Sequence, residues 1–118
     1  MKVAVIGQGP LGIEAALHLI SLGAEATLFS DGKKGGAISR ICELAHDLEI
    51  WESWEQATSK IGRDYLEKNL DESKKLTSLS YLEEYLNPIY DKLKAQDVIR
   101  EVVVDRVTKT ALRKSTWM

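Results

Sequence analysis

Near its N-terminus the chain has three glycines at the spacing of a phosphate-binding turn, Gly7, Gly9 and Gly12. They follow a β-branched run, Lys2 to Ile6, and Pro10 can open a helix because its missing N–H is tolerated in the first helical turn. In such a turn the first glycine permits a sharp bend, the second lets the backbone approach a pyrophosphate, and the third lets helix and strand pack closely. The backbone N–H groups at the start of the helix then face the phosphate.

These glycines also have a purely structural interpretation, in which they serve a tight strand-to-helix turn in a domain that binds nothing. A fold can persist after the other contacts to its ligand have been removed. The context favours the first interpretation, because the motif follows a predicted strand and opens a predicted helix. We therefore expect the turn to belong to a nucleotide-binding unit.

The position expected to contact the ribose of a dinucleotide differs from the usual one. Dinucleotide folds commonly place Asp or Glu at the end of the second strand, where the carboxylate accepts hydrogen bonds from ribose hydroxyls. Here that position is Ser30, and Asp31 follows it. A serine can bond a ribose hydroxyl more weakly, or can tolerate a 2′-phosphate that a carboxylate would repel. Asp31 can reach the ribose instead, or can form a turn with Gly32.

The elements that must position these residues can be traced from the apolar pattern. Leu11 to Leu22 is apolar on most faces and precedes Gly23, which predicts a largely covered helix with a glycine stop. Ala24 to Phe29 reads as a second strand. Strand, helix and strand within about 30 residues predict a βαβ unit with a right-handed crossover. The expected fold class is α/β, with a Rossmann-type first unit and a small parallel sheet.

Between the second strand and a third, valine-rich strand at Val98 to Val107, the pattern predicts a helical insertion over about residues 37–96. Ser53 with Gln56, and Ser80 with Glu83, resemble capping boxes that begin helices. Beyond the second of these, an apolar stripe stays in phase across Pro88, which predicts a kinked helix or two abutting helices.

Aromatic side chains of the insertion are expected to pack rather than to react. Tyr81, Tyr85 and Tyr90 share the apolar stripe, and we expect their hydroxyl groups to reach water. Trp51 and Trp54 are expected to pack in the core or between helices.

A metal site is not expected. Cys42 and His46 lie four residues apart on a predicted helix, with Glu49 on the next turn. Two or three ligands without further cysteine or histidine nearby make a poor site. Cys42 is also the only cysteine, so no internal disulfide can form and a reducing cytoplasm is the expected setting.

The overall composition excludes several classes of function. The chain has 118 residues, of which 44% are hydrophobic and 29% charged, so global disorder is not expected. A net charge of −2 gives no general attraction to nucleic acid or to an anionic membrane. No segment approaches the roughly 18 consecutive apolar residues of a membrane span.

The N-terminal residues resemble a known group, the FAD-dependent oxidoreductases of the glutathione-reductase-like and flavin-monooxygenase-like kind. The similar run is VAVIGQGPLGIEAALHLISLGAEATLFSDG, followed by Gly35 and Gly36. Its proline and its later glycine pair are more typical of FAD binders than of simple NAD dehydrogenases. A weaker similarity links SYLEEYLNPIYDKL and VIREVVVDRVTK to a helix-then-strand segment of bacterial pyridine nucleotide-disulfide oxidoreductase-like flavoproteins.

The resemblance implies FAD as the cofactor, with NAD(P) as the alternative, and it implies a contact for each matching residue. Gly7, Gly9, Pro10, Leu11 and Gly12 would line the pyrophosphate, Ser30 would lie at the ribose, Gly35 and Gly36 near the AMP half, and Val104 at the adenine.

The expected function is therefore FAD binding by a single domain, residues 1–118, that forms the N-terminal part of a flavin-dependent oxidoreductase. A second glycine fingerprint and an NAD(P)H subdomain are missing from the sequence, so we expect a truncated domain that does not turn over alone, and its catalytic residues stay unknown. One alternative is an NAD(P)-binding or regulatory module without catalysis. Another is a non-binding remnant that associates with itself or another chain through exposed apolar surface.

Overall fold

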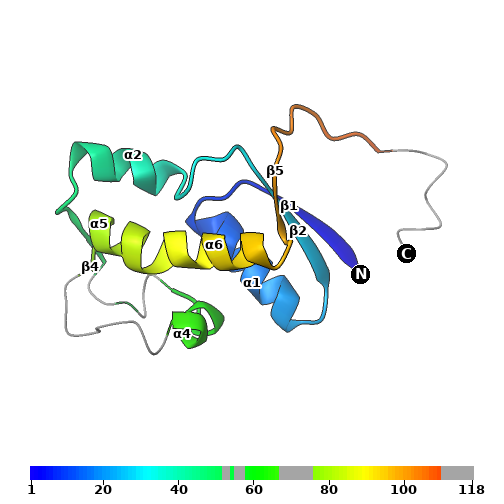
Figure 1. Ribbon diagram of the computed structural model, residues 1–118, viewed down its shortest axis with the longest axis horizontal. Helices are drawn as coiled ribbons and strands as arrows, with labels where there is room; N and C mark the ends of the chain where they lie inside the picture. The colour runs from blue at the N-terminus through cyan, green and yellow to red at the C-terminus, as the bar shows by residue number, and fades with distance from the viewer. Residues whose placement is uncertain (52–53, 55–57, 67–75, 110–118) are drawn as a thin grey trace.

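A parallel sheet of three strands organises the chain, in the order β1-β2-β5. The structure is a computed structural model that describes residues 1–51, 54, 58–66 and 76–109. The strands are β1 (Lys2–Ile6), β2 (Glu25–Ser30) and β5 (Ile99–Glu101). Both pairings are parallel, and helices pack against the sheet (Figure 1). The predicted α/β class with a small parallel sheet is confirmed.

The first two strands are joined by α1 (Pro10–Ser21), which completes the predicted βαβ unit. Ile13, Ala16 and Leu17 are fully buried on the helix face that packs against the sheet. The helix ends before Gly23, whose φ of 83° is the left-handed conformation that glycine adopts without strain. The apolar face and its glycine stop thus fix the crossover that presents the turn after β1.

The third strand is shorter than predicted. β5 ends at Glu101, whereas the sequence predicts a strand that continues to Val107. The reason lies in its partner: β2 ends at Ser30, which is the register partner of Glu101, and β2 then turns away at Gly32 with a φ of 87°. Residues 102–109 therefore pair with none of the described strands and lie outside the sheet.

The residues between β2 and β5 hold helices, as predicted, and also a two-stranded antiparallel sheet that the sequence pattern did not predict. The elements are α2 (Ala37–Leu44), β3 (Glu49–Trp51), α4 (Lys60–Leu66), β4 (Leu76–Thr77), α5 (Ser78–Tyr81), the π-helix η1 (Leu82–Leu86) and α6 (Asn87–Ala95). β3 pairs with β4. The predicted capping box of Ser53 and Gln56 lies outside the described residues.

A continuous helical run forms the last part of the insertion (Figure 1). It begins at Thr77, whose side chain accepts a bond from the Ser80 N–H while the Ser80 hydroxyl accepts one from the Thr77 N–H. The predicted start at Ser80 is therefore wrong by one turn. The π-helical segment η1 ends at Leu86, and α6 begins at Asn87 with Pro88 in its first turn. The two helical segments therefore abut, which is one of the two predicted arrangements.

Three tyrosines of this run are buried, and the expectation that their hydroxyl groups reach water is wrong. The Tyr85 hydroxyl donates to the Glu14 carboxylate of α1, and the Tyr90 hydroxyl bonds both Ser30 and Glu101. Burial requires such partners because an unpaired buried hydroxyl is costly. Trp54 is also buried in this core, as predicted.

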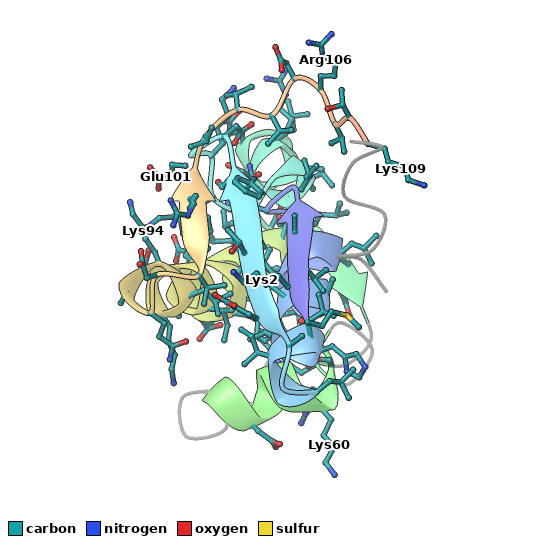
Figure 2. All side chains as sticks on the ribbon, turned by 90° about the vertical axis from the view of Figure 1, so that its right-hand side faces the viewer. Lys2, Lys60, Lys94, Glu101, Arg106 and Lys109 are labelled. Carbon is teal, nitrogen blue, oxygen red and sulfur yellow. The ribbon has the colours of Figure 1, made fainter. Side chains whose placement is uncertain are left out.

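Within the described ranges of the chain, helices cover one face of the parallel sheet and leave the other face open. Figure 2 looks onto the open face and labels Lys2, the first residue of the edge strand β1. Lys2, Ala4 and Ile6 alternate along β1 as exposed side chains, and 55% of Ile6 is exposed. A shallow hollow of about 200 Å³ crosses this face between β1 and β2. In the part of the chain that the structure describes, no helix is long and apolar enough to span a membrane.

Candidate nucleotide-binding site

The turn after β1 needs two of its three glycines for the fold itself. Gly7 has a φ of 110°, and its N–H donates to the Phe29 carbonyl of β2 at 3.0 Å. A β-carbon on Gly12 would overlap the Gly7 carbonyl oxygen. These two positions have the roles that the motif assigns to its first and third glycines, the sharp bend and the close packing of helix on strand.

The middle glycine of the turn is not required by the fold. Gly9 caps α1 with an ordinary φ of −70°, and a β-carbon there would meet no atom within 4 Å. A side-chain cap such as Ser, Asp or Asn would stabilise the helix start slightly better than glycine does. Beside Gly9 there is therefore open space, which the methyl group of an alanine at this position would begin to fill.

The helix start beside Gly9 offers free donors. The first i to i−4 bond of α1 runs from the Ile13 N–H to the Gly9 carbonyl at 3.0 Å, so the N–H groups of Leu11 and Gly12 precede the helical ladder. The first turn of α1 carries no acidic side chain. Leu11 itself is 85% exposed. The positive end of the helix dipole thus faces the space beside Gly9 without a resident counter-charge.

The second glycine-rich segment lies directly against the first. Gly35 and Gly36 have φ values of 84° and 55°, and a β-carbon on Gly36 would come within 2.9 Å of the Gly9 Cα. A β-carbon on Gly35 would overlap a methyl group of Leu82. The structure therefore brings together Gly9 and Gly36, which are far apart in the sequence and which the resemblance assigns to the same ligand.

Gln8 links the two segments and was not singled out from the sequence. Its side chain is buried, and Nε2 donates to Asp31 Oδ1 at 2.5 Å and to the Lys33 carbonyl at 2.7 Å. Asp31 Oδ1 also accepts the Lys33 N–H at 2.9 Å. The only sequence signal for Gln8 is its place inside the glycine motif, where side chains are usually unconstrained. Asp31 thus forms the turn after β2, one of the two roles open to it.

Ser30 lies in the interior at the end of β2. Only 1% of the residue is exposed, and its Oγ is 2.9 Å from the Tyr90 hydroxyl and accepts the Gly32 N–H at 3.0 Å. The fold therefore gives the Ser30 hydroxyl two partners of its own. Its contact with a ribose stays a prediction, as does an adenine contact of Val104, which is half-buried three residues beyond the end of β5.

A charged network lies beside Ser30 at the end of β5. Glu101 Oε1 accepts from the Lys94 ammonium at 2.8 Å and from the Tyr90 hydroxyl at 3.0 Å. The bond from Lys94, and next that from Tyr90, lowers the pKa of the Glu101 carboxyl below its ordinary value. The same pairing raises the pKa of Lys94. Both groups are therefore charged at neutral pH.

A basic hollow of about 450 Å³ adjoins the glycine pair at the start of α2. Three of its lining side chains are cationic and one is anionic. Lys34 pairs with Asp91 at 2.5 Å. Arg40 lies 3.9 Å from Glu43, a weak exposed pair. The lining residues are Lys33, Lys34, Gly36, Ser39, Arg40 and Glu43.

The residues weighed as metal ligands do not converge. Cys42 is half-buried on α2, while His46 and Glu49 are exposed. Among the described residues, no three His, Cys, Asp or Glu side chains form a group that could hold a metal ion. The chain matches no protein-family model, no curated protein and no solved structure.

Proposed function

We propose that the chain binds FAD, with the cofactor's pyrophosphate against the turn from Gly7 to Gly12, and that it serves as the cofactor domain of a flavin-dependent oxidoreductase. The observation that carries this proposal is Gly9, a glycine that neither the backbone angles nor the packing explains. A ligand that must approach the backbone closely does explain it. With Cys42 as its only cysteine, such a domain suits a reducing cytoplasm.

The chain's own groups would bind and orient the cofactor. The N–H groups of Leu11 and Gly12 would donate to pyrophosphate oxygens, and the uncapped dipole of α1 would favour their negative charge. Gly36, which has no side chain, lets the segment after β2 lie directly against Gly9. FAD, when bound, supplies hydride and electron transfer, while the protein supplies position and electrostatics.

The test compares wild type with Gly9→Ala. The purified proteins are titrated with FAD and followed by calorimetry and flavin fluorescence. We expect Gly9→Ala to lower the melting temperature only slightly, because its methyl group meets open space and only the N-cap preference for glycine over alanine is lost, and to weaken FAD binding by roughly tenfold or more. Ser21→Ala, an exposed change at the other end of α1, should alter neither. FAD binding that is equal in wild type and Gly9→Ala, or absent from wild type, would overturn the proposal.

A specific observation favours a second candidate, an NADP-type dinucleotide at the same turn. The basic hollow beside Gly36 holds Lys33 and Arg40, and cationic groups that follow the second strand can accommodate a 2′-phosphate. Under this alternative wild type binds NADPH more tightly than FAD, and Arg40→Gln weakens NADPH binding without changing FAD binding. A protein that binds neither ligand would favour the non-binding alternative, in which the open sheet face mediates association.

A further inference from the structure

The end of β2 lacks the carboxylate that usually receives the ribose hydroxyls, and the adjacent strand supplies one. Parallel strands present their carboxyl ends at one edge of a sheet, where ligands of such folds bind. At this edge Ser30 and Glu101 are register partners on β2 and β5. The Ser30 hydroxyl is buried against Tyr90, but the Glu101 side chain is 39% exposed. A carboxylate therefore stands one strand away from the expected position.

The two oxygens of this carboxylate have different surroundings. Oε1 is held by Lys94 at 2.8 Å and by Tyr90 at 3.0 Å, which fixes the orientation of the group. Oε2 lies over the turn that follows β2, 3.9 Å from the position of a β-carbon on Gly32. Because Gly32 has no side chain, nothing at that residue covers Oε2. Figure 2 shows Lys94 and Glu101 together beside β5.

Asp31 is the other acid near the end of β2 that could bond a ribose, and its side chain makes different hydrogen bonds from that of Glu101. Its Oδ1 accepts both the Gln8 amide and the Lys33 N–H, so the side chain holds the turn together. Glu101 makes no bond to the turn and is braced from the opposite side by α6. Each acid thus has one carboxylate oxygen that accepts two bonds, but Glu101 is the one that is the register partner of Ser30 and is held from the side of α6.

We propose that Glu101 accepts the hydrogen bonds of the adenosine ribose hydroxyls, in the role that an acid at position 30 would otherwise have. This inference rests on the proposed dinucleotide binding. The dinucleotide would run across the carboxyl ends of the strands, with its pyrophosphate at the turn after β1 and its adenosine ribose between the ends of β2 and β5. A carboxylate there selects a free ribose diol and disfavours a 2′-phosphate, because like charges repel.

The test measures how well each protein discriminates ADP from 2′,3′-dideoxy-ADP, which lacks the ribose hydroxyls. Dissociation constants are determined by calorimetry or NMR titration. We expect wild type to bind ADP roughly tenfold more tightly than the dideoxy compound, as hydrogen bonds to a charged group imply. Glu101→Ala should bind the two compounds equally, with an affinity for dideoxy-ADP like that of wild type.

Two control variants separate this role from a structural one. Lys94→Met removes the ammonium but keeps the carboxylate, and it should keep the discrimination. Asp31→Asn tests the rival acid and should also keep it. The inference would be overturned if Glu101→Ala still discriminated ADP from 2′,3′-dideoxy-ADP, or if Asp31→Asn lost this discrimination instead. FAD binding that depends on Gly9 would in either case still support the proposed function. If wild type binds neither FAD nor ADP, both proposals fail together.

Discussion

Tyr85 is the residue through which α1 and the helical insertion share a buried hydrogen bond. Its hydroxyl donates to Glu14, whose other carboxylate oxygen accepts the Ser59 N–H at 3.2 Å. The Tyr85 ring stacks on Tyr81 with centroids 5.6 Å apart. Burial, followed by the bond to Glu14, raises the pKa of Tyr85 well above its ordinary value, and burial does the same for Tyr81. Both phenols are therefore held in their neutral form.

This buried hydroxyl leads to a prediction for Gly62 of α4. A glycine to alanine change inside a helix ordinarily stabilises it by about 0.5 to 1 kcal/mol. Here a β-carbon would overlap the Tyr85 hydroxyl, which packing and the bond to Glu14 hold in place. We expect Gly62→Ala to lower the free energy of unfolding by about 1 to 3 kcal/mol, measured by urea denaturation. Lys60→Ala, an exposed change on the same helix, should stay within about 0.5 kcal/mol of wild type, and a Gly62→Ala as stable as wild type would contradict the argument.

The same tyrosines predict a loss of stability in alkaline solution. In the unfolded chain they ionise near their ordinary pKa of 10.0, whereas in the folded chain they keep their protons. The folded state then binds more protons, so the contribution is fully present below pH 10 and is lost as the pH rises above it. Each tyrosine adds a slope of up to about 1.4 kcal/mol per pH unit.

Denaturation in urea between about pH 8 and about pH 11 measures this slope, because it brackets the ordinary tyrosine pKa. Tyr85→Phe should be less stable than wild type at neutral pH by about 1.5 to 3 kcal/mol, since it loses a bond to a charged group. Its stability should also fall less steeply above pH 10. An identical alkaline slope in the two proteins would refute the assignment.

The sequence could predict the Tyr85 stripe but not its chemistry. The spacing of the apolar residues correctly predicted that the tyrosine rings are buried, because helical periodicity is a local signal. The hydroxyl partner Glu14 lies 71 positions away, and no local pattern joins the two residues. The glycines behave in the same way: Gly7 and Gly12 could be assigned from their spacing, whereas the contact of Gly9 with Gly36 required the folded chain.

At the scale of elements, long segments were predictable and short ones were not. α1 has an apolar face, a proline at its start and a glycine after its end, and its bounds follow from these signals. β3 and β4 have only three and two residues, too few to show a period. β5 looked longer in sequence because valines continue after Glu101, but a strand also needs a partner, and β2 ends there. Tertiary pairing, not propensity, set that boundary.

The capping box at Thr77 gives a prediction at this scale. The Thr77 side chain and the Ser80 side chain each accept a bond from the other residue's N–H, which fixes where the run from α5 to α6 begins. We expect Thr77→Ala to lower the free energy of unfolding by about 1 kcal/mol and to leave the helix content of the folded protein unchanged. Thr77→Ser, which keeps the hydroxyl, should restore most of the loss. Equal stability of the Ala and Ser variants would show that the cap contributes nothing.

For the whole molecule, the sheet joins strands that are close together in the sequence to a strand that is far from them in the sequence. β1, α1 and β2 are contiguous in sequence, and β1 shares five register pairs with β2. β5 follows the entire insertion and shares three register pairs with β2. Fewer pairs and a long closing loop make the second junction the weaker one. The fold class could be predicted because the local part carries its signals in one stretch of chain.

Native-state hydrogen exchange tests this difference. The Leu28 N–H, which bonds the Val98 carbonyl at 2.9 Å, should exchange through a smaller opening free energy than the Gly7 N–H, which bonds Phe29 across β1 and β2. The difference between the two opening free energies should be largest at low denaturant concentration and should vanish where both amides exchange through global unfolding. Equal protection of the two amides at every denaturant concentration would mean that the sheet opens as one unit.

The position of β1 at the border of the sheet has a consequence for behaviour in concentrated solution. The Glu25 N–H bonds the Met1 carbonyl and the Gly7 N–H bonds Phe29, so the intervening backbone groups of Lys2, Ala4 and Ile6 point away from β2. Such a row can template a strand from another chain. The charge of Lys2 opposes pairing with another chain at one end of β1. Ile6, at the other end, has no charge that would oppose it. At high concentration, pairing through these backbone groups can therefore join chains even though their net charge of −2 makes them repel one another.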